Sequence, residues 1–315
     1  MRNLFLNIFY LFSKKKGFHK NEISLSDEFY SPGGKKENKT TIVVMIDGRQ
    51  LHGGFADRIR GIVTIYQFCK DRKIPFYINY TYPFELNEFL EPNKYDWRID
   101  KSNLVYNLNA AQPCLLYEWM YPHKFHKWYL KLLCLRRKQL HVYTNSHFEY
   151  EKFSIGFNEL FKPVPNLKVL IDKHKKSIGD KYNVMVFRFQ QLLGDFKEGN
   201  NIVLSEEKRQ ILISKCINKI RIMYNGKKLL ITSDSITFIN KVKSLDFVYV
   251  IPGSVVHIDY TENAPLSTYM KTFLDFFLIA NADIIYLLLT DNMYKSGFPK
   301  TASKVFNRPF EVICF

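Results

Sequence analysis

Strands and helices alternate along the second half of this 315-residue chain, and that alternation limits the possible folds more than any other feature. Between residues 183 and 313, short aliphatic runs that predict buried strands are separated by longer stretches with helical periodicity. An alternation of strands and helices of this kind forms a parallel sheet with right-handed crossovers. The predicted strands are 183–187, 228–232, 247–251, 283–289 and 310–313, and the predicted helices are 205–223, 235–245, 265–280 and 299–306.

The first half of the chain begins in the same way but loses its regularity. The run TIVVMI at 41–46 is typical of a strand buried on both faces, and a helical pattern at 56–70 and a strand at 74–80 follow it. Residues 82–161 mix aromatic and basic side chains without clear periodicity, and we expect mostly helices there.

Two α/β halves joined by a proline-containing segment predict two domains. The segment Lys162-Pro163-Val164-Pro165 marks the expected boundary, so a first Rossmann-like domain covers 41–165 and a second covers 166–315. Residues 1–40 are predicted to be an N-terminal amphipathic segment and a polar linker. Because ligands of such sheets bind beyond the carboxyl ends of the strands, we expect a cleft between two facing domains.

The composition fits a globular protein with a basic surface. Hydrophobic residues make up 46% of the chain, which excludes a disordered tail or a fibrous repeat. The net charge of +16 predicts a surface that attracts phosphates, nucleic acid or an anionic membrane. The five cysteines are scattered and form no C-x-x-C pair, which favours a reducing compartment such as the cytoplasm over a disulfide framework.

An apolar run at 4–12 lies near the N-terminus and is followed by Lys14, Lys15 and Lys16. This run is far shorter than the roughly 20 residues that cross a bilayer. A peripheral segment on the inner face of the cytoplasmic membrane would place its apolar side chains in lipid and its lysines at anionic headgroups. A terminal helix packed on the first domain is the other interpretation.

The first group of candidate site residues follows the strand at 41–46. Gly53 and Gly54 permit close approach of the backbone, and the helix start that carries Asp57 and Arg58 offers backbone amides to an anion. An ordinary strand-to-helix turn with Asp57 near the N-cap explains the same residues.

The second group follows two strands of the second half. Arg188 leaves the strand at 183–187, where a guanidinium is costly unless an anion or a carboxylate accepts its donors. A diphosphate and Asp195 are the two candidate partners. Ser233 and Asp234 follow the next strand. Either they contact the same ligand, or Asp234 or Ser235 only caps the next helix.

Two further segments complete the candidate site. Ser296 and Gly297 precede a helix that begins near Phe298, so its backbone amides would point at a ligand. His257 follows the strand at 247–251, and it either touches a nucleoside or sugar or is a structural histidine.

Several catalytic signatures are missing from the sequence. It contains no P-loop lysine motif, no G-x-G-x-x-G, no H-E-x-x-H and no G-x-S-x-G. It also lacks a D-x-D pair of the kind that holds a metal and a sugar nucleotide. Chemistry on a diphosphate donor without a metal or other cofactor is the interpretation that fits this pattern.

The order of the motifs resembles that of the fucosyltransferase-related glycosyltransferases of the GT-B type, which include α-1,2-, α-1,6- and protein-O-fucosyltransferases. GGFADR, VFRFQQLLGDF, TSDS and KSGFPKTAS match that group's Gly-rich loop, Arg motif, S-D motif and late S-x-F motif. The match covers roughly residues 41–89 and 183–310, and the displaced Gly194-Asp195 departs from the usual H-x-R-R-G-D pattern.

The resemblance implies an inverting, metal-independent transferase that uses GDP-fucose as donor and acts on a glycan hydroxyl. A surface polysaccharide on a lipid carrier would be an acceptor that also explains the basic surface. Inversion calls for stabilisation of the leaving diphosphate, which falls to Arg188, and for a general base, for which Asp57 is the candidate. The residues implied in the nucleotide pocket are Ser233, Asp234, Ser296, Gly297 and Phe298.

Two other interpretations stay open. A GT-B enzyme with another nucleotide sugar would have the same fold. A basic nucleic-acid-binding protein would explain the charge and the 20 Tyr and 27 Phe residues. The lysines are dispersed and the aromatic residues lie mainly in apolar runs, so we expect no nucleic-acid partner.

Overall fold

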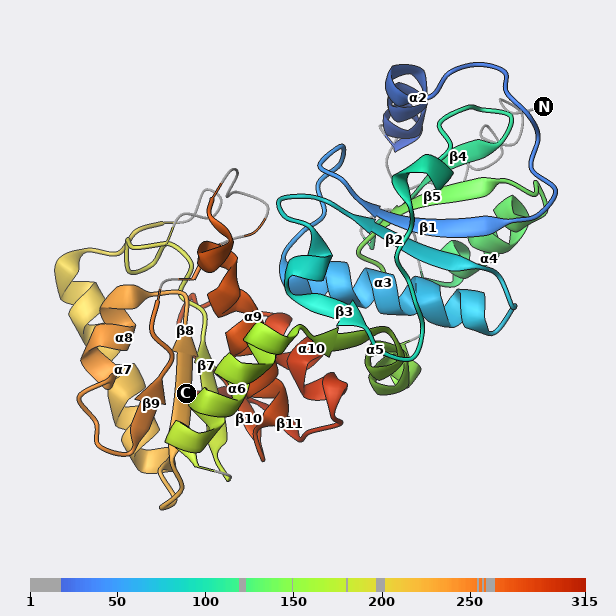
Figure 1. Ribbon diagram of the computed structural model, residues 1–315. Helices are drawn as coiled ribbons and strands as arrows, with labels where there is room; N and C mark the ends of the chain where they lie inside the picture. The colour runs from blue at the N-terminus through green and yellow to red at the C-terminus, as the bar shows by residue number, and fades with distance from the viewer. Residues whose placement is uncertain are drawn as a thin grey trace. The chain divides into compact units, whose positions relative to one another are not determined.

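The chain divides into two compact units (Figure 1). Unit 1 comprises Met1–Leu86 and Glu91–Lys162, and unit 2 comprises Asn87–Leu90 and Pro163–Phe315. The chain thus passes between units at Lys162 and Pro163, inside the segment predicted as a boundary. The computed structural model describes residues 18–118, 123–148, 150–179, 181–196, 202–253, 255, 256, 258 and 264–315.

Unit 1 is built on a parallel sheet with the strand order β2-β1-β5-β4. Helix α3 packs on β1, β2 and β5, and Gly61 permits this contact because a Cβ there would lie 2.5 Å from the carbonyl oxygen of Thr144. The strands are β1 (Thr41–Ile46), β2 (Phe76–Tyr80), β4 (Ala111–Leu116) and β5 (Gln139–Thr144), and the helices are α2 (Phe18–Phe29), α3 (Phe55–Lys70), α4 (His123–Cys134) and α5 (Phe153–Leu160). Short strands β3 (Leu90–Pro92) and β6 (Phe161–Pro163) pair separately.

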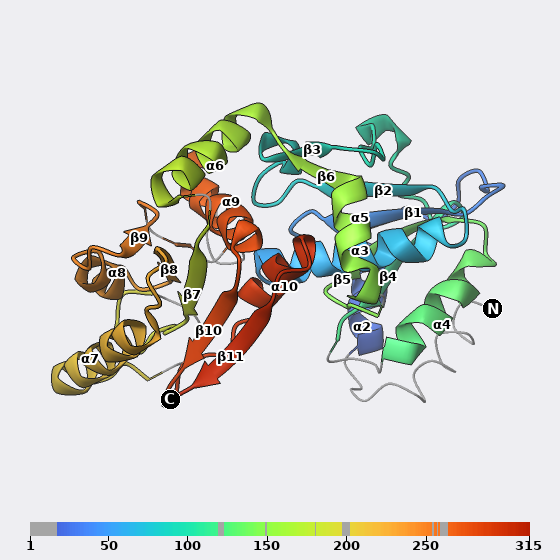
Figure 2. The same ribbon diagram turned by 90° about the horizontal axis from the view of Figure 1, so that it is seen from below.

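Unit 2 is built on a parallel sheet with the order β11-β10-β7-β8-β9. Helices α7 and α8 cover one face and α6, α9 and α10 the other (Figure 2). The rings of Phe187 and Phe189 both pack on Phe238 of α8, with centroids 4.8 and 4.9 Å away. The strands are β7 (Asn183–Phe187), β8 (Leu229–Ser233), β9 (Val248–Val250), β10 (Ile285–Leu289) and β11 (Phe310–Cys314), and the helices are α6 (Pro165–Ile178), α7 (Glu206–Met223), α8 (Ile236–Val242), α9 (Leu266–Asn281) and α10 (Phe298–Val305).

The predicted elements of the second half are confirmed, with ends that differ by at most three residues. The element that sequence reasoning missed there is α6. Pro165 occupies the first turn of this helix, where its missing N–H costs nothing, so the residue interpreted as part of a boundary also begins a helix.

The prediction of mostly helices for residues 82–161 is wrong, because two strands of the sheet, β4 and β5, lie in this range. Pro113 argues against a strand at 111–116 in the sequence. β4 is an edge strand, however, and tolerates a residue without an N–H donor. His141 obscured β5. Its ring is buried, with Nδ1 2.6 Å from the Tyr30 hydroxyl and Nε2 2.7 Å from the Gln139 side-chain oxygen.

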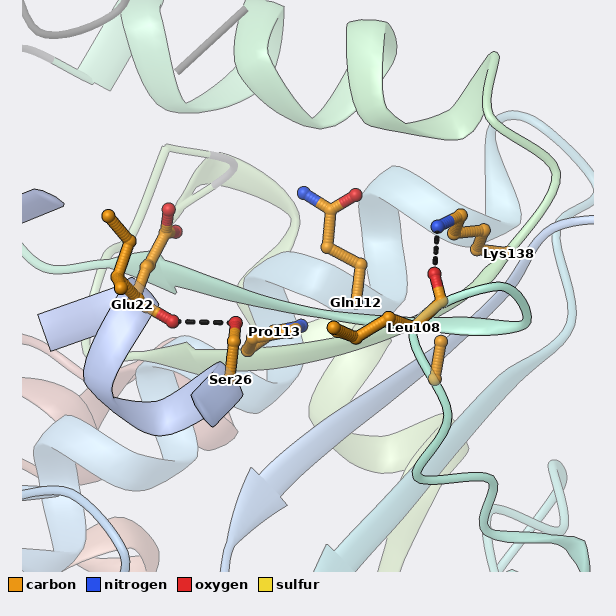
Figure 3. A pocket seen from close by; sticks show the side chains of 8 residues that line it. Glu22, Ser26, Leu108, Gln112, Pro113 and Lys138 are labelled. Carbon is orange, nitrogen blue, oxygen red and sulfur yellow. Dashed lines mark hydrogen bonds between the residues drawn. The ribbon is translucent and has the colours of Figure 1, made fainter. Parts of the chain in front are cut away.

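The prediction of a polar linker up to residue 40 is also wrong in part, because α2 packs on β4. Leu25 is buried, and the buried Glu22 carboxylate accepts the Leu115 amide at 2.8 Å. A cavity of about 20 Å³ beside Glu22 lies between α2, β4 and the segment that carries Lys138 (Figure 3). The apolar run at 4–12 and the three lysines after it lie outside the described residues.

Among the helices that the structure describes, none combines the length and the apolar character needed to cross a bilayer.

Candidate functional site

Arg188 lies at the carboxyl end of the central strand of unit 2. It follows β7 directly, and its side chain is 16% exposed. The guanidinium lies over the ring of Phe196, 4.5 Å from the centroid, and its Nη1 is 3.4 Å from Oδ2 of Asp234. Arg188 is thus held by a ring and a carboxylate at the sheet edge where ligands of parallel sheets bind.

Asp234 joins the loops after β7 and β8. Its carboxylate accepts the backbone amides of Phe189 at 2.9 Å and Gln190 at 2.7 Å. Gln190 has a φ of 52°, so these bonds hold a left-handed turn directly after Arg188. Burial raises the pKa of Asp234, although Arg188 and the two amides act in the opposite direction.

Ser233 and Ser235 serve mainly to build the turn into α8. The Ser233 hydroxyl accepts the Ser235 amide at 3.1 Å and lies 3.4 Å from Asp234 Oδ1. The Ser235 hydroxyl caps α8 by accepting the Phe238 amide at 3.1 Å. The structure therefore supports the capping interpretation for Ser235, and it places Ser233 and Asp234 beside Arg188.

Asp195 is the carboxylate that the sequence offers as a partner of Arg188, and in the structure it caps α8. Its Oδ2 accepts the Ser235 hydroxyl at 2.8 Å and the Thr237 amide at 2.7 Å. Its Oδ1 is buried and has no hydrogen-bond partner among the described residues. Asp195, which the insertion separates from Arg188 in the sequence, therefore lies beside the turn into α8.

The segment before α10 reaches the Arg188 loop through the main chain. The Tyr294 amide donates to the carbonyl oxygen of Arg188 at 3.0 Å. The Ser296 hydroxyl accepts the Phe298 amide at 3.2 Å, and the Gly297 carbonyl accepts the Thr301 amide at 3.0 Å. Because β10, β7 and β8 are neighbours in the sheet, the loops after these three strands meet at one edge.

Three predicted residues of the second half remain: Phe298, Gly297 and His257. The ring of Phe298 packs edge-on against Phe276 of α9, with centroids 5.6 Å apart. Gly297 is exposed before the helix. His257 lies outside the described residues.

The glycine loop of unit 1 has a backbone that depends on glycine. Gly53 has a φ of 75°, and a Cβ there would lie 3.0 Å from Oδ2 of Asp57. Gly54 is the N-cap of α3, and its carbonyl accepts the amides of Asp57 at 3.0 Å and Arg58 at 3.1 Å. The loop therefore passes very close to the first turn of the helix.

Arg58 stands at the helix start that we expect near the donor, and its side chain contacts groups of unit 1. Its side chain is fully buried, with 0% of the residue exposed. Its Nε donates to the Gly53 carbonyl at 2.9 Å, and its Nη1 donates to the Tyr80 hydroxyl at 3.0 Å and the Tyr82 carbonyl at 2.6 Å. Arg58 therefore positions the glycine loop from inside unit 1.

Asp57 lies in the first turn of α3, and its side chain is 36% exposed. Its carboxylate forms an ion pair with Arg60, one turn along the same helix. Arg60 is also 3.8 Å from Glu118. Asp57 thus remains accessible, as a catalytic base must be.

Sequence reasoning missed Asp47, a second carboxylate at the same end of the unit 1 sheet. Asp47 follows β1 directly, and its side chain is only 7% exposed. It accepts the Tyr143 hydroxyl at 3.1 Å and the Arg49 amide at 3.2 Å, and burial raises its pKa. Its position directly after a fully apolar strand was the available signal.

His52 packs on Tyr143, the residue whose hydroxyl donates to Asp47. Its ring stacks on Tyr143 with centroids 6.1 Å apart, and its Nε2 accepts the Gly48 amide at 3.2 Å. Burial, with a smaller contribution from Arg58, lowers the pKa of His52 to about 3. His52 is therefore neutral at physiological pH and holds the loop after β1. Within the described ranges, no group of three or more His, Cys, Asp or Glu side chains is placed to hold a metal ion.

The chain is similar to known proteins in its structure but not detectably in its sequence. No protein-family model and no curated protein sequence matches the chain. A mutant of FUT1 from Arabidopsis thaliana in complex with GDP matches 95% of this chain and 75% of its own, with a TM-score of 0.54 and 12% identity. The α-1,6-fucosyltransferase NodZ from Bradyrhizobium, soaked with GDP-fucose, matches 86% of this chain and 93% of its own, with a TM-score of 0.51 and 13% identity.

These matches show the fold. The predicted α/β class with two Rossmann-like units is confirmed, and the chain has the GT-B fold of these fucosyltransferases.

The buried position of Arg58 predicts a large effect on stability. Arg58→Ala removes three hydrogen bonds from a charged donor and leaves a cavity, so we expect the free energy of unfolding to fall by more than about 3 kcal/mol. Arg60→Ala on the same helix removes a partly exposed ion pair and should cost about 1 kcal/mol or less. Urea unfolding of both variants measures the difference, and equal losses would refute the structural role of Arg58.

Proposed function

We propose that the protein is an inverting glycosyltransferase that moves fucose from GDP-fucose to a hydroxyl group of a glycan or lipid-linked oligosaccharide. The observation that carries this proposal is the convergence of Arg188, Asp234 and the segment before α10 at one edge of the unit 2 sheet. The same fold occurs in a FUT1 mutant in complex with GDP and in NodZ soaked with GDP-fucose. Unit 2 is then the donor-binding unit and unit 1 the acceptor-binding unit.

Arg188 has the task of stabilising the leaving diphosphate. Charge develops on the bridging oxygen as the bond to the sugar breaks, and a fixed guanidinium lowers the energy of that transition state. The contacts with Phe196 and Asp234 restrict the side chain before a ligand binds. Because the side chain is already restricted, it loses less conformational entropy when the ligand binds.

The other proposed donor-binding residues surround this cation. Asp234 and Ser233 hold the turn after β7, and the exposed Gly297 and the Ser296 hydroxyl lie at the start of α10. Gly53 and Gly54 would offer a close backbone approach in unit 1. Phe298 and His257 stay in the proposal as neighbours of the nucleoside.

The reaction would proceed without a metal ion, since Arg188 and backbone amides supply the positive charge that a metal provides in other transferases. The absence of a D-x-D pair from the sequence supports this part of the proposal. Asp57 is the proposed general base, because its carboxylate is accessible and ion-paired with Arg60. It would take the proton of the acceptor hydroxyl as that oxygen attacks the anomeric carbon.

We also propose that the enzyme works in the cytoplasm at a membrane surface. The net charge of +16 and the apolar run at 4–12 before three lysines support this location. A polysaccharide that grows on a lipid carrier is an acceptor found at such a surface.

The role of Arg188 predicts a specific loss of activity. Arg188→Ala should reduce GDP-fucose turnover by at least about a hundredfold, the usual effect of removing one preorganised donor from a transition state. Arg221→Ala, on the exposed face of α7 in the same unit, should leave turnover within about twofold. The release of GDP from GDP-fucose measures both variants, and near-normal turnover of Arg188→Ala would refute the assignment.

The choice of Asp57 as base predicts a difference between two carboxylates of unit 1. Asp57→Asn should lower turnover by about a hundredfold or more and change the affinity for GDP little, because a base acts on the acceptor. Asp47→Asn should mainly lower the free energy of unfolding, because Asp47 is buried and bonded to Tyr143. Steady-state kinetics and calorimetric titration with GDP test this pair, and the opposite pattern would assign the base to Asp47.

A further inference from the structure

Helix α4 of unit 1 has an unusual outer face. Its inner face consists of His126, Tyr129, Leu130 and Leu133, all buried at helical spacing. Helix α4 lies at the edge of unit 1 (Figure 2). That outer face, together with the turn after the helix, carries Lys124, Lys127, Trp128, Lys131, Leu135 and Arg137, which we call the α4 face.

Two large apolar side chains of the α4 face are open to solvent. Trp128 is 46% exposed and Leu135 is 77% exposed. The ring of Phe125 packs edge-on against Trp128, with centroids 6.2 Å apart. Isolated exposed apolar residues are common, but an exposed indole on α4 and an exposed leucine directly after it, among lysines, form an amphipathic surface.

The charge around these side chains has one sign. Residues 119–148 contain six Lys or Arg residues and no Asp or Glu. Two of the six are turned toward the sheet: Arg136 donates to the Gln112 side-chain oxygen at 2.8 Å, and Lys138 donates to the carbonyl oxygen of Leu108 (Figure 3). The four others belong to the α4 face.

We propose that the α4 face docks on the surface of a bilayer that contains anionic lipid. A tryptophan ring is suited to the headgroup level, because its body is apolar and its N–H can bond to water or phosphate. Leu135 would enter the acyl boundary, and the lysines and Arg137 would contact lipid phosphates. A nucleic acid would use the same cations but would gain little from the exposed leucine, so the lipid surface fits the whole set better.

This inference does not depend on the identity of the nucleotide or sugar. It also concerns a surface different from the apolar run at 4–12. If both segments bind lipid, they do so as two signals, the number that stable peripheral attachment generally requires.

Sedimentation of the full chain with phosphatidylcholine vesicles, with and without phosphatidylglycerol, tests the proposal. The wild type should bind only the anionic vesicles at low salt. Lys124→Glu with Lys131→Glu should weaken that binding by about twenty-fivefold or more, since each lysine at an anionic surface contributes about fivefold. Trp128→Ser with Leu135→Ser keeps the charge and should weaken binding by roughly tenfold through the loss of apolar insertion.

The matched control is Lys173→Glu with Lys176→Glu, which makes the same change of net charge at exposed positions on α6 of unit 2. It should leave vesicle binding within about threefold of wild type. An equal loss in this control would show that net charge, and not the α4 face, drives binding. Wild-type binding by both α4 variants, or no binding by the wild type, would overturn the proposal.

Two further readouts separate other causes. All variants should keep the circular dichroism spectrum and the thermal response to GDP of the wild type, because the altered side chains are exposed and lie outside the proposed nucleotide site. If the wild type itself shows no response to GDP, the proposed function fails while the vesicle result still decides this inference. Loss of binding to a labelled oligonucleotide, with vesicle binding intact, would assign the α4 face to nucleic acid and overturn the lipid proposal.

Discussion

The bond between the Asp234 carboxylate and the backbone after β7 is the interaction on which the candidate site of unit 2 depends. One buried carboxylate accepts two consecutive amides and also faces the Arg188 guanidinium. Without this acceptor, the left-handed turn at Gln190 would bury two unpaired N–H groups and Arg188 would lose its charged neighbour. The same side chain therefore determines both the path of the loop and the direction of the cation.

Unit 1 uses the opposite charge for a similar purpose. The buried Arg58 guanidinium donates to the carbonyls of Gly53 and Tyr82 and thereby ties together the loops that follow β1 and β2. Each unit thus places a buried ionisable side chain where neighbouring parallel strands end, and main-chain groups form hydrogen bonds with it. This arrangement stiffens the strand-end loops and leaves Asp57 and Arg188 at the surface of these loops, where they can meet a ligand.

The sequence predicts the elements of unit 2 well because buried parallel strands there are continuous aliphatic runs and each helix has a clear apolar period. It fails for β4 and β5, whose Pro113 and His141 fit only because of the edge position of β4 and the Tyr30 hydroxyl. It also identifies Arg188, Asp234 and the glycine loop as candidates by their place after strands. It could not tell an accessible arginine from the buried Arg58, because burial depends on tertiary packing with Tyr80 and Tyr82.

The central claim is that the Arg188 edge of unit 2 binds a guanosine diphosphate group. Calorimetric titration of the wild type with GDP, UDP, CDP and ADP, each with and without a chelator, tests it directly. GDP should bind, the chelator should leave this binding unchanged, and Arg188→Ala should weaken it by about tenfold or more, as expected for a lost charge-assisted contact. Preference for a uridine or cytidine nucleotide would reject fucose as the transferred sugar, and no binding of any nucleotide would contradict the transferase account.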